Sequence, residues 1–139
     1  MLYNILIIDD SPSMRKVLQK VIAMAGLPVE CFEASDGIQG LDQCRHHRID
    51  VIFTDLNMPN MDGFTFLKQI HQNPAFDDIP VLVVSTEGRT ALIEEALKLG
   101  VANFINKPFQ AEEIADKLHN ILGEGYDHRE DRTTEAPDF

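Results

Sequence analysis

Five short apolar runs alternate with five helical patterns along most of the chain, and this alternation restricts the fold more than any other feature. The apolar runs are Tyr3–Ile8, Val29–Ala34, Ile49–Asp55, Val81–Val84 and Ala102–Ile105. Each is followed by apolar residues at helical spacing, at Met14–Ala25, Ile38–Arg45, Phe64–Ile70, Leu92–Leu99 and Ile114–Leu122. Strands and helices that alternate in this way predict an α/β domain with a parallel sheet, helices on both faces and right-handed crossovers.

The helical pattern stops near Gly123, and residues 124–139 are polar and aperiodic. We therefore predict one domain at 1–123 and an acidic disordered tail, or a linker, at 124–139. The formal net charge of the whole chain is −11. Nucleic-acid surfaces need basic patches that displace counterions, so this charge favours a protein partner or a small cation over a nucleic acid.

Neither a membrane anchor nor a disulfide is expected from the sequence. No apolar run approaches the ~20 residues that a membrane helix needs, and the first ten residues lack the basic region of a signal peptide. We therefore expect a cytoplasmic protein without membrane insertion. Its two cysteines, Cys31 and Cys44, are then predicted to be free core thiols.

Polar side chains gather at the ends of the predicted strands. Asp55 ends the third run, and Pro59 shortly after it cannot continue a central strand because it has no N–H to donate. The carboxyl ends of parallel strands meet at one edge of a sheet, where ligands bind in open α/β folds. The residues that the pattern brings to this edge are Asp9, Asp10, Asp55, Ser85, Thr86, Asn106 and Lys107.

Three clustered carboxylates repel one another, at about 1 kcal/mol per pair at 4 Å in water and several-fold more near a protein surface. Oxygen ligands of this kind suit Mg²⁺, with Mn²⁺ as an alternative. A cation there would screen a carboxylate from a phosphoryl group, which makes attack of the carboxylate on phosphorus feasible. Lys107 could contact phosphate oxygens, and Ser85 or Thr86 could donate a hydrogen bond to them.

Each of these features alone is also explained as a helix cap or a solvated loop side chain. Their shared position at the ends of successive strands favours a common site. The remaining candidates, His46, His47 and His71, fall at predicted helix ends away from this edge, and we interpret them as solvated side chains rather than metal ligands.

With these residues in place, the chain resembles the receiver domain of two-component response regulators over roughly residues 1–123. In size it is most similar to single-domain regulators of the chemotaxis type. The matching motifs are Ile7-Ile8-Asp9-Asp10-Ser11, Asp55-Leu56-Asn57-Met58-Pro59, Asp62-Gly63, Val84-Ser85-Thr86 and Asn106-Lys107-Pro108-Phe109. The resemblance implies a flavodoxin-like (βα)5 doubly wound parallel sheet with strand order 2-1-3-4-5.

The resemblance also implies a phosphorylation site and a metal site. Asp55 is the expected phosphoacceptor. The expected Mg²⁺ ligands are Asp10 and Asp55 through their side chains, Asn57 through its backbone carbonyl, and Asp9 through water.

Further roles are implied around the phosphoryl group. Ser85 is expected to bind a phosphoryl oxygen and to report its presence, and Lys107 to contact phosphate. The Lys107–Pro108 peptide bond is expected to be cis. Phe104 occupies the position of an aromatic switch that turns inward on activation.

Two departures from the family pattern concern this switch and the phosphoryl lifetime. Phe104 has no hydroxyl, so its inward state must depend on burial alone, and we expect a weaker or differently tuned switch. The bulk of Thr86 would restrict water near the phosphoryl group, whereas Asn57 and Glu87 could position water there. These effects oppose each other, so no lifetime is predicted.

The function implied is a signalling phosphoacceptor rather than an enzyme, although it would assist its own phosphotransfer and dephosphorylation. A histidine kinase or a phosphotransfer protein would supply the phosphoryl group. A downstream protein would then bind the surface formed by residues 92–99, 102–105 and 114–122.

Three other functions compete with this interpretation. A receiver that only binds or dimerises is disfavoured by the intact Asp9, Asp10, Asp55 and Lys107. A phosphohydrolase with an aspartyl-phosphate intermediate usually has an Asp-x-Asp pair after the first strand, whereas the pair here is adjacent. A flavin module is disfavoured because the first loop is acidic and would not cradle a phosphate.

Overall fold

The structure is a computed structural model, and it describes residues 2–123 of the 139-residue chain. The predicted tail at 124–139 lies outside the described residues. The strands are β1 (Tyr3–Ile8), β2 (Val29–Ala34), β3 (Val51–Thr54), β4 (Val81–Ser85) and β5 (Asn103–Asn106). The helices are α1 (Pro12–Ala23), α2 (Gly37–His46), α3 (Gly63–Gln72), α4 (Thr90–Lys98) and α5 (Ala111–Leu118), followed by a π-helical segment, η1 (His119–Gly123).

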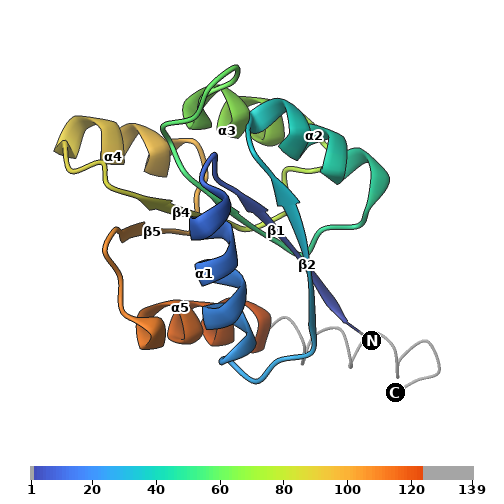
Figure 1. Cartoon of the computed structure of the whole chain (residues 1–139). Helices are drawn as coiled ribbons and strands as arrows, with labels where there is room; N and C mark the ends of the chain where they lie inside the picture. Colours follow the sequence, from blue (N-terminus) through green and yellow to red (C-terminus); the bar gives the residue numbers. More distant parts are fainter. Residues whose placement is uncertain (1, 124–139) are drawn as a thin grey trace.

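The five strands form one parallel sheet in the order β2-β1-β3-β4-β5, which confirms the predicted fold (Figure 1). β3 lies at the centre, and all four of its residues are buried. Such continuous burial is typical of a strand that is covered on both faces. β2 lies at an edge, in agreement with its more polar sequence.

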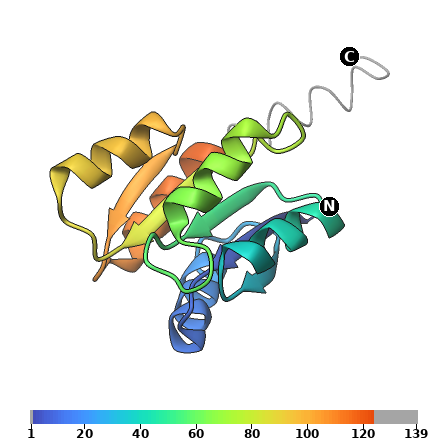
Figure 2. The same cartoon turned by 90° about the horizontal axis from the view of Figure 1, so that it is seen from above.

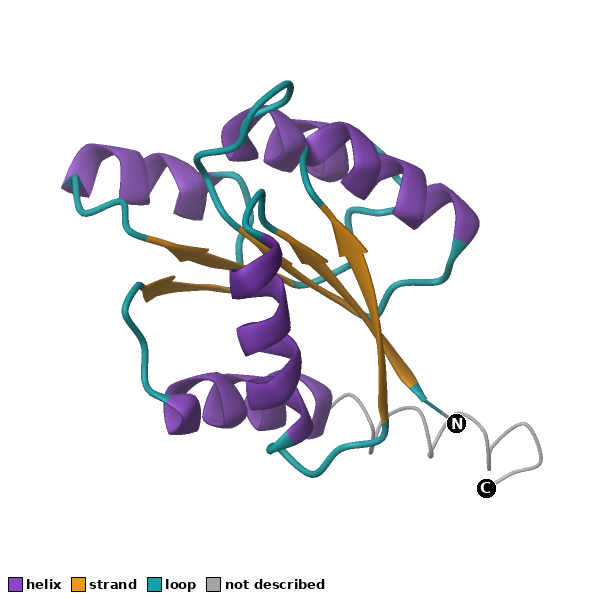
Figure 3. Ribbon diagram, viewed as in Figure 1, coloured by secondary structure: helices purple, strands orange, loops and turns teal. Residues whose placement is uncertain are grey.

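Helices cover both faces of the sheet, as the alternating pattern predicts. In Figures 1 and 3, α1 and α5 lie on one face, and α2, α3 and α4 lie on the other. Figure 2 looks onto this second layer, with α3 between α2 and α4. Successive residues of a strand point to opposite faces, so Ile5 and Ile7 pack in one core and Leu6 and Ile8 in the other.

Local signals fix where the helices begin and end. The side chains of Ser11, Asp36 and Asp62 cap α1, α2 and α3 by accepting backbone N–H groups of the first helical turn. Gly26 and Gly100, shortly after α1 and α4, have φ angles of 79° and 88°, a conformation that glycine adopts without strain.

The boundaries of several elements differ from the prediction, and β4 ends at Ser85 rather than Val84. β3 spans Val51–Thr54 rather than Ile49–Asp55. Asp55 follows the strand, and its side chain accepts the N–H of Leu56. β5 begins and ends one residue later than predicted. The α-helical part of the last helix ends at Leu118, and π-helical turns continue to Gly123, which keeps Leu122 buried.

Within residues 2–123, none of the helices has the length and apolarity needed to cross a membrane.

Candidate functional site

The site lies at the edge of the sheet where the carboxyl ends of β1, β3, β4 and β5 meet. Carboxylate oxygens of Asp9, Asp10 and Asp55 lie within 4.8 Å of one another. They form the only group of this kind among the described residues. The structure therefore brings together the three acidic residues that the sequence placed at this edge, and their all-oxygen donor set fits a hard divalent cation.

Asp55 is buried and held by the backbone around it. Its N–H donates to the carbonyl of Ile8 at 3.1 Å, which ties it to the end of β1. Its Oδ1 accepts the N–H of Leu56 at 2.6 Å and that of Asn57 at 3.3 Å. Oδ2 contacts the Nζ of Lys107 at 3.0 Å. Oδ1 of Asp55 is thus held by backbone N–H groups of the loop, while Oδ2 contacts the ammonium group of the flexible Lys107 side chain.

The two neighbouring aspartates, Asp9 and Asp10, differ in exposure. Asp9 is buried, and its Oδ1 accepts the N–H of Ser11 at 2.9 Å at the start of α1. Its Oδ2 lies 2.8 Å from the Nζ of Lys107. Asp10 is exposed. The arrangement combines one carboxylate anchored inside the protein with one that solvent reaches freely.

Lys107 joins the carboxylates of Asp9 and Asp55. Burial acts to lower the pKa of Lys107, but its hydrogen bonds to Asp9 and Asp55 outweigh burial, so its pKa lies above the ordinary value. A raised pKa stabilises the protein below the ordinary pKa of lysine, and this stabilisation is lost as the pH rises through the raised value. The ammonium is therefore charged throughout the neutral range. The Lys107–Pro108 bond is cis, as expected.

Replacing Lys107 with Met is expected to tighten Mg²⁺ binding. A bound cation must compete with the ammonium that now neutralises Asp9 and Asp55. Removing one charge at such distances changes the affinity by roughly tenfold. Isothermal titration calorimetry with Mg²⁺ measures the effect. Lys68→Met on α3 is the control, with unchanged affinity expected, and weaker binding by Lys107→Met would contradict the prediction.

Ser85 and Thr86 differ in exposure. Ser85 is fully buried at the end of β4, and its Oγ accepts the N–H of Glu87 at 3.1 Å. Because this oxygen acts as an acceptor, the hydroxyl hydrogen remains available for another partner. Thr86, the next residue, is exposed.

Glu87 and Arg89 form a pair that the sequence did not predict. Arg89 donates to the Glu87 carboxylate from Nε at 2.8 Å and from its second guanidinium nitrogen at 2.9 Å. Its backbone N–H donates to the same group at 2.9 Å. These bonds, the side-chain ones foremost, lower the pKa of Glu87 to about 2. The carboxylate of Glu87, which we expected to position water, is thus already hydrogen-bonded to Arg89.

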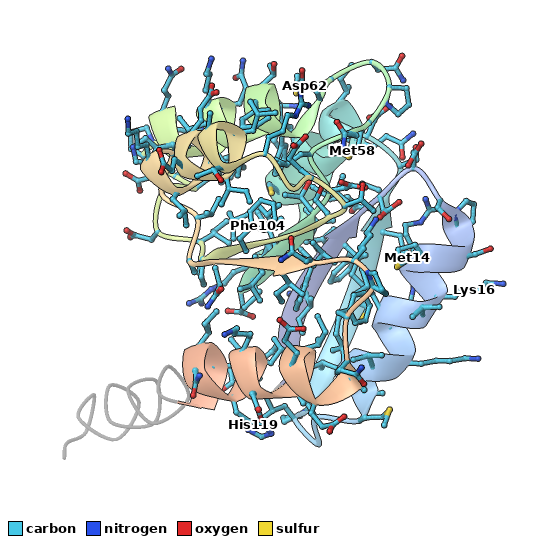
Figure 4. All side chains as sticks on the ribbon, turned by 90° about the vertical axis from the view of Figure 1, so that its left-hand side faces the viewer. Met14, Lys16, Met58, Asp62, Phe104 and His119 are labelled. Atoms are coloured by element: carbon cyan, nitrogen blue, oxygen red, sulfur yellow. The ribbon has the colours of Figure 1, made fainter. Side chains whose placement is uncertain are left out.

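Asn57 and Phe104 are the remaining residues to which the resemblance assigns a role. The side chain of Asn57 is exposed, and its N–H faces Asp55. Phe104 on β5 is half-buried and packs against the core on the α4 side of the sheet (Figure 4). It pairs with Val83 across the sheet, so it lies well inside the strand.

Within residues 2–123, the histidines and cysteines take no part in the carboxylate site. Cys31 and Cys44 are free, as predicted, and burial raises the pKa of Cys44 to about 11. His46 ends α2, and His71 lies in the last turn of α3. His47 is not merely solvated, because its ring stacks on Phe32 with 4.2 Å between the ring centroids.

Comparison with known proteins agrees with the geometry of the site. A family model described as the response regulator receiver domain matches residues 5–119. A chemotaxis protein CheY homolog from Campylobacter jejuni is 34% identical over 123 residues, which cover 88% of this chain and 94% of the relative.

Solved structures are similar as well. Chemotaxis response regulator CheY4 of Vibrio cholerae has a TM-score of 0.79 at 30% identity, covering 88% of this chain and 100% of that one. The Mn(2+)-bound form of response regulator Rcp1 has a TM-score of 0.74 at 25% identity, covering 86% and 91%.

Proposed function

Because this chain belongs to the response regulator receiver domain family, we propose that Asp55 accepts a phosphoryl group in a Mg²⁺-dependent reaction. Receiver domains of CheY-like regulators are phosphoacceptor switches in two-component signalling, and they interact with histidine kinases or phosphotransfer proteins. The observation that carries the proposal is the position of Asp55, which lies beside two further carboxylates and in contact with Lys107.

The proposed ligands of Mg²⁺ are the side chains of Asp10 and Asp55 and the backbone carbonyl of Asn57, while Asp9 binds the ion through water. When bound, the ion neutralises charge on the incoming phosphoryl group and on the carboxylates. The backbone N–H groups of Leu56 and Asn57 hold one oxygen of Asp55 and so orient the carboxylate.

The transfer itself forms a bond between a carboxylate oxygen of Asp55 and phosphorus, while the bond between phosphorus and the donor's histidine nitrogen breaks. Lys107 moves from the carboxylates to the phosphoryl oxygens and follows the negative charge. Ser85, whose oxygen now accepts from Glu87, turns its hydroxyl to donate to a phosphoryl oxygen. Thr86, which follows Ser85 and is exposed, adds bulk near the phosphoryl group, while Asn57 could position water there.

Removing the metal is expected to prevent labelling by a small acyl phosphate. Without a cation, the carboxylates repel the phosphoryl dianion as well as one another. Phosphorylated protein is measured by mass spectrometry with Mg²⁺, with excess chelator, and with Mg²⁺ restored. Labelling that persists in chelator would contradict the metal requirement.

This labelling, together with an assay of turnover on small phosphate esters, separates the competing functions. A receiver that serves only as a binding module would remain unlabelled even with Mg²⁺. A phosphohydrolase would turn over small phosphate esters many times, whereas the proposed switch forms one phosphorylated residue per chain.

We further propose that phosphorylation changes binding at the surface of α4, β5 and α5, where a downstream protein docks. Ser85 ends β4, and the loop after it leads directly into α4. Movement of the Ser85 hydroxyl towards the phosphoryl group would therefore displace this loop. A local charge change that biases a two-state element is the general form of such a switch.

The rotamer of Phe104 reports this change. The ring is expected to shift inward when a phosphoryl mimic such as beryllofluoride binds, although less completely than a ring whose hydroxyl finds a partner. Nuclear magnetic resonance of a ring-labelled sample, with and without the mimic, measures the rotamer populations. Identical populations in both states would show that Phe104 is no switch.

A further inference from the structure

The loop between β3 and α3, residues 55–62, is fastened to the start of α2 by one side-chain hydrogen bond. The Nδ2 of Asn60 donates to the Oδ2 of Asp36 at 2.7 Å, across 24 positions of sequence. Beside it, the N–H of Gly37 donates to the carbonyl of Met61 at 3.4 Å. The tip of the loop is thereby tied to an element that contributes no residue to the carboxylate site.

The hydrogen bond from Asn60 holds the loop at the residue where its backbone is strained. Asn60 has a φ angle of 66°, and it is the only non-glycine residue with a positive φ among residues 2–123. The N–H of Met61 donates to the carbonyl of Pro59 at 2.7 Å, which closes a three-residue turn around Asn60. Turns of this kind with a positive φ are rare and strained, and they persist where neighbouring contacts fix them.

Asp36 is well suited to hold this turn. It is 5% exposed, and its two carboxylate oxygens accept hydrogen bonds from different partners. Oδ1 caps α2 by accepting the N–H of Gln39 at 2.8 Å, while Oδ2 accepts from Asn60. The bond to Gln39 and then the bond to Asn60 lower the pKa of Asp36. Asp36 is therefore ionised at neutral pH, and its hydrogen bonds are charge-assisted, which makes them stronger than neutral ones.

We infer that Asp36 and Asn60 are positioning residues for metal binding, because their hydrogen bond fixes the loop that presents the Asn57 carbonyl. The inference rests on the proposed function. One end of this loop is fixed at Asp55 and the other at Gly63, whose N–H donates to the carbonyl of Leu56 at 2.9 Å. Between these points, Met58 and Met61 pack against the core, and the bond from Asn60 to Asp36 is the polar side-chain contact that reaches another element. Without it, Asn57 would sample orientations in which its carbonyl misses the ion.

Two variants remove the bond while keeping the surrounding structure. Asn60→Gly deletes the amide but retains the freedom to adopt a positive φ. Asp36→Ser retains a cap for α2, since serine is a favourable N-cap residue, but has no second oxygen for Asn60. Asp62→Ser is the matched control: it also replaces a capping aspartate by serine and removes one charge, but Asp62 caps α3 rather than α2.

Calorimetric titration with Mg²⁺ is expected to show about fivefold weaker binding for Asn60→Gly and for Asp36→Ser, consistent with the loss of about one hydrogen bond. The double variant is expected to bind no more weakly than either single one. Hydrogen exchange at the amide of Met61 should accelerate in both single variants. Asp62→Ser should match the wild type in affinity and exchange.

Unchanged Mg²⁺ affinity in both single variants would overturn the inference, and so would losses that simply add in the double variant. A failure of the proposed function would appear differently. In that case the wild type itself would neither bind Mg²⁺ nor become labelled at Asp55, whereas the inference alone fails if the wild type does both and the variants bind equally well.

Discussion

Asp55→Asn is expected to reduce phosphoryl labelling by at least about 100-fold, because a neutral amide is a far poorer nucleophile than a carboxylate. The substitution is nearly isosteric. Its side-chain oxygen can still accept the N–H of Leu56, so the loop should keep its conformation. Incubation with acetyl phosphate and Mg²⁺, followed by intact-mass measurement, gives the labelled fraction.

The matched control for this prediction is Asp62→Asn. Asp62 lies in the same loop and is exposed at the start of α3 (Figure 4). Asparagine also caps helices well, so this variant should fold and become labelled like the wild type. Equal labelling of Asp55→Asn and wild type would show that another residue accepts the phosphoryl group.

Gly63→Ala is expected to destabilise the protein by about 3 kcal/mol, at the upper end of the usual cost of overpacking. A Cβ at this position would collide with the carbonyl oxygen of Asp55 and the Cα of Leu56. Both are backbone atoms, so no side chain can rotate away to make room. Relief would require the loop to shift next to Asp55, the proposed nucleophile, and labelling should also decrease. Urea unfolding measures the change in free energy.

Gly88→Ala serves as the comparison. Gly88 lies in the loop after β4, and a Cβ there would meet nothing within 4 Å. Its free energy of unfolding should differ from wild type by less than about 1 kcal/mol. A Gly63→Ala protein as stable as Gly88→Ala would mean that the loop can move away from Gly63 at little cost.

Much of the fold follows from local sequence patterns. The bounds of β1 and β2 agree with prediction because apolar runs and turn residues mark both ends clearly. The strand order could not be predicted from these patterns, because the alternation of strands and helices is compatible with several orders. The order came from the family resemblance, which matched motifs at the strand ends.

The carboxylate cluster was predictable for a topological reason. Asp9, Asp10 and Asp55 each follow an apolar strand, and a parallel sheet brings such positions to one edge. No side-chain geometry was needed for this step. The exposure of each residue was not predictable, because the burial of Asp9 and the exposure of Asp10 depend on how α1 leaves the sheet.

Contacts between distant loops could not be predicted in this way. The bond between Asn60 and Asp36 depends on the path of a loop whose sequence only indicates turns. The pair of Glu87 and Arg89 is close in sequence, and opposite charges two residues apart were the available signal. That spacing alone does not distinguish an ion pair from two solvated side chains.

Localising the phosphoryl group by peptide mass spectrometry tests the central claim most directly. Wild-type protein is treated with acetyl phosphate and Mg²⁺, digested under conditions that preserve acyl phosphates, and fragmented. We predict a single phosphoryl group on Asp55 that is absent when Mg²⁺ is chelated. A phosphoryl group on any other residue, or an unlabelled protein in the presence of Mg²⁺, would contradict the account.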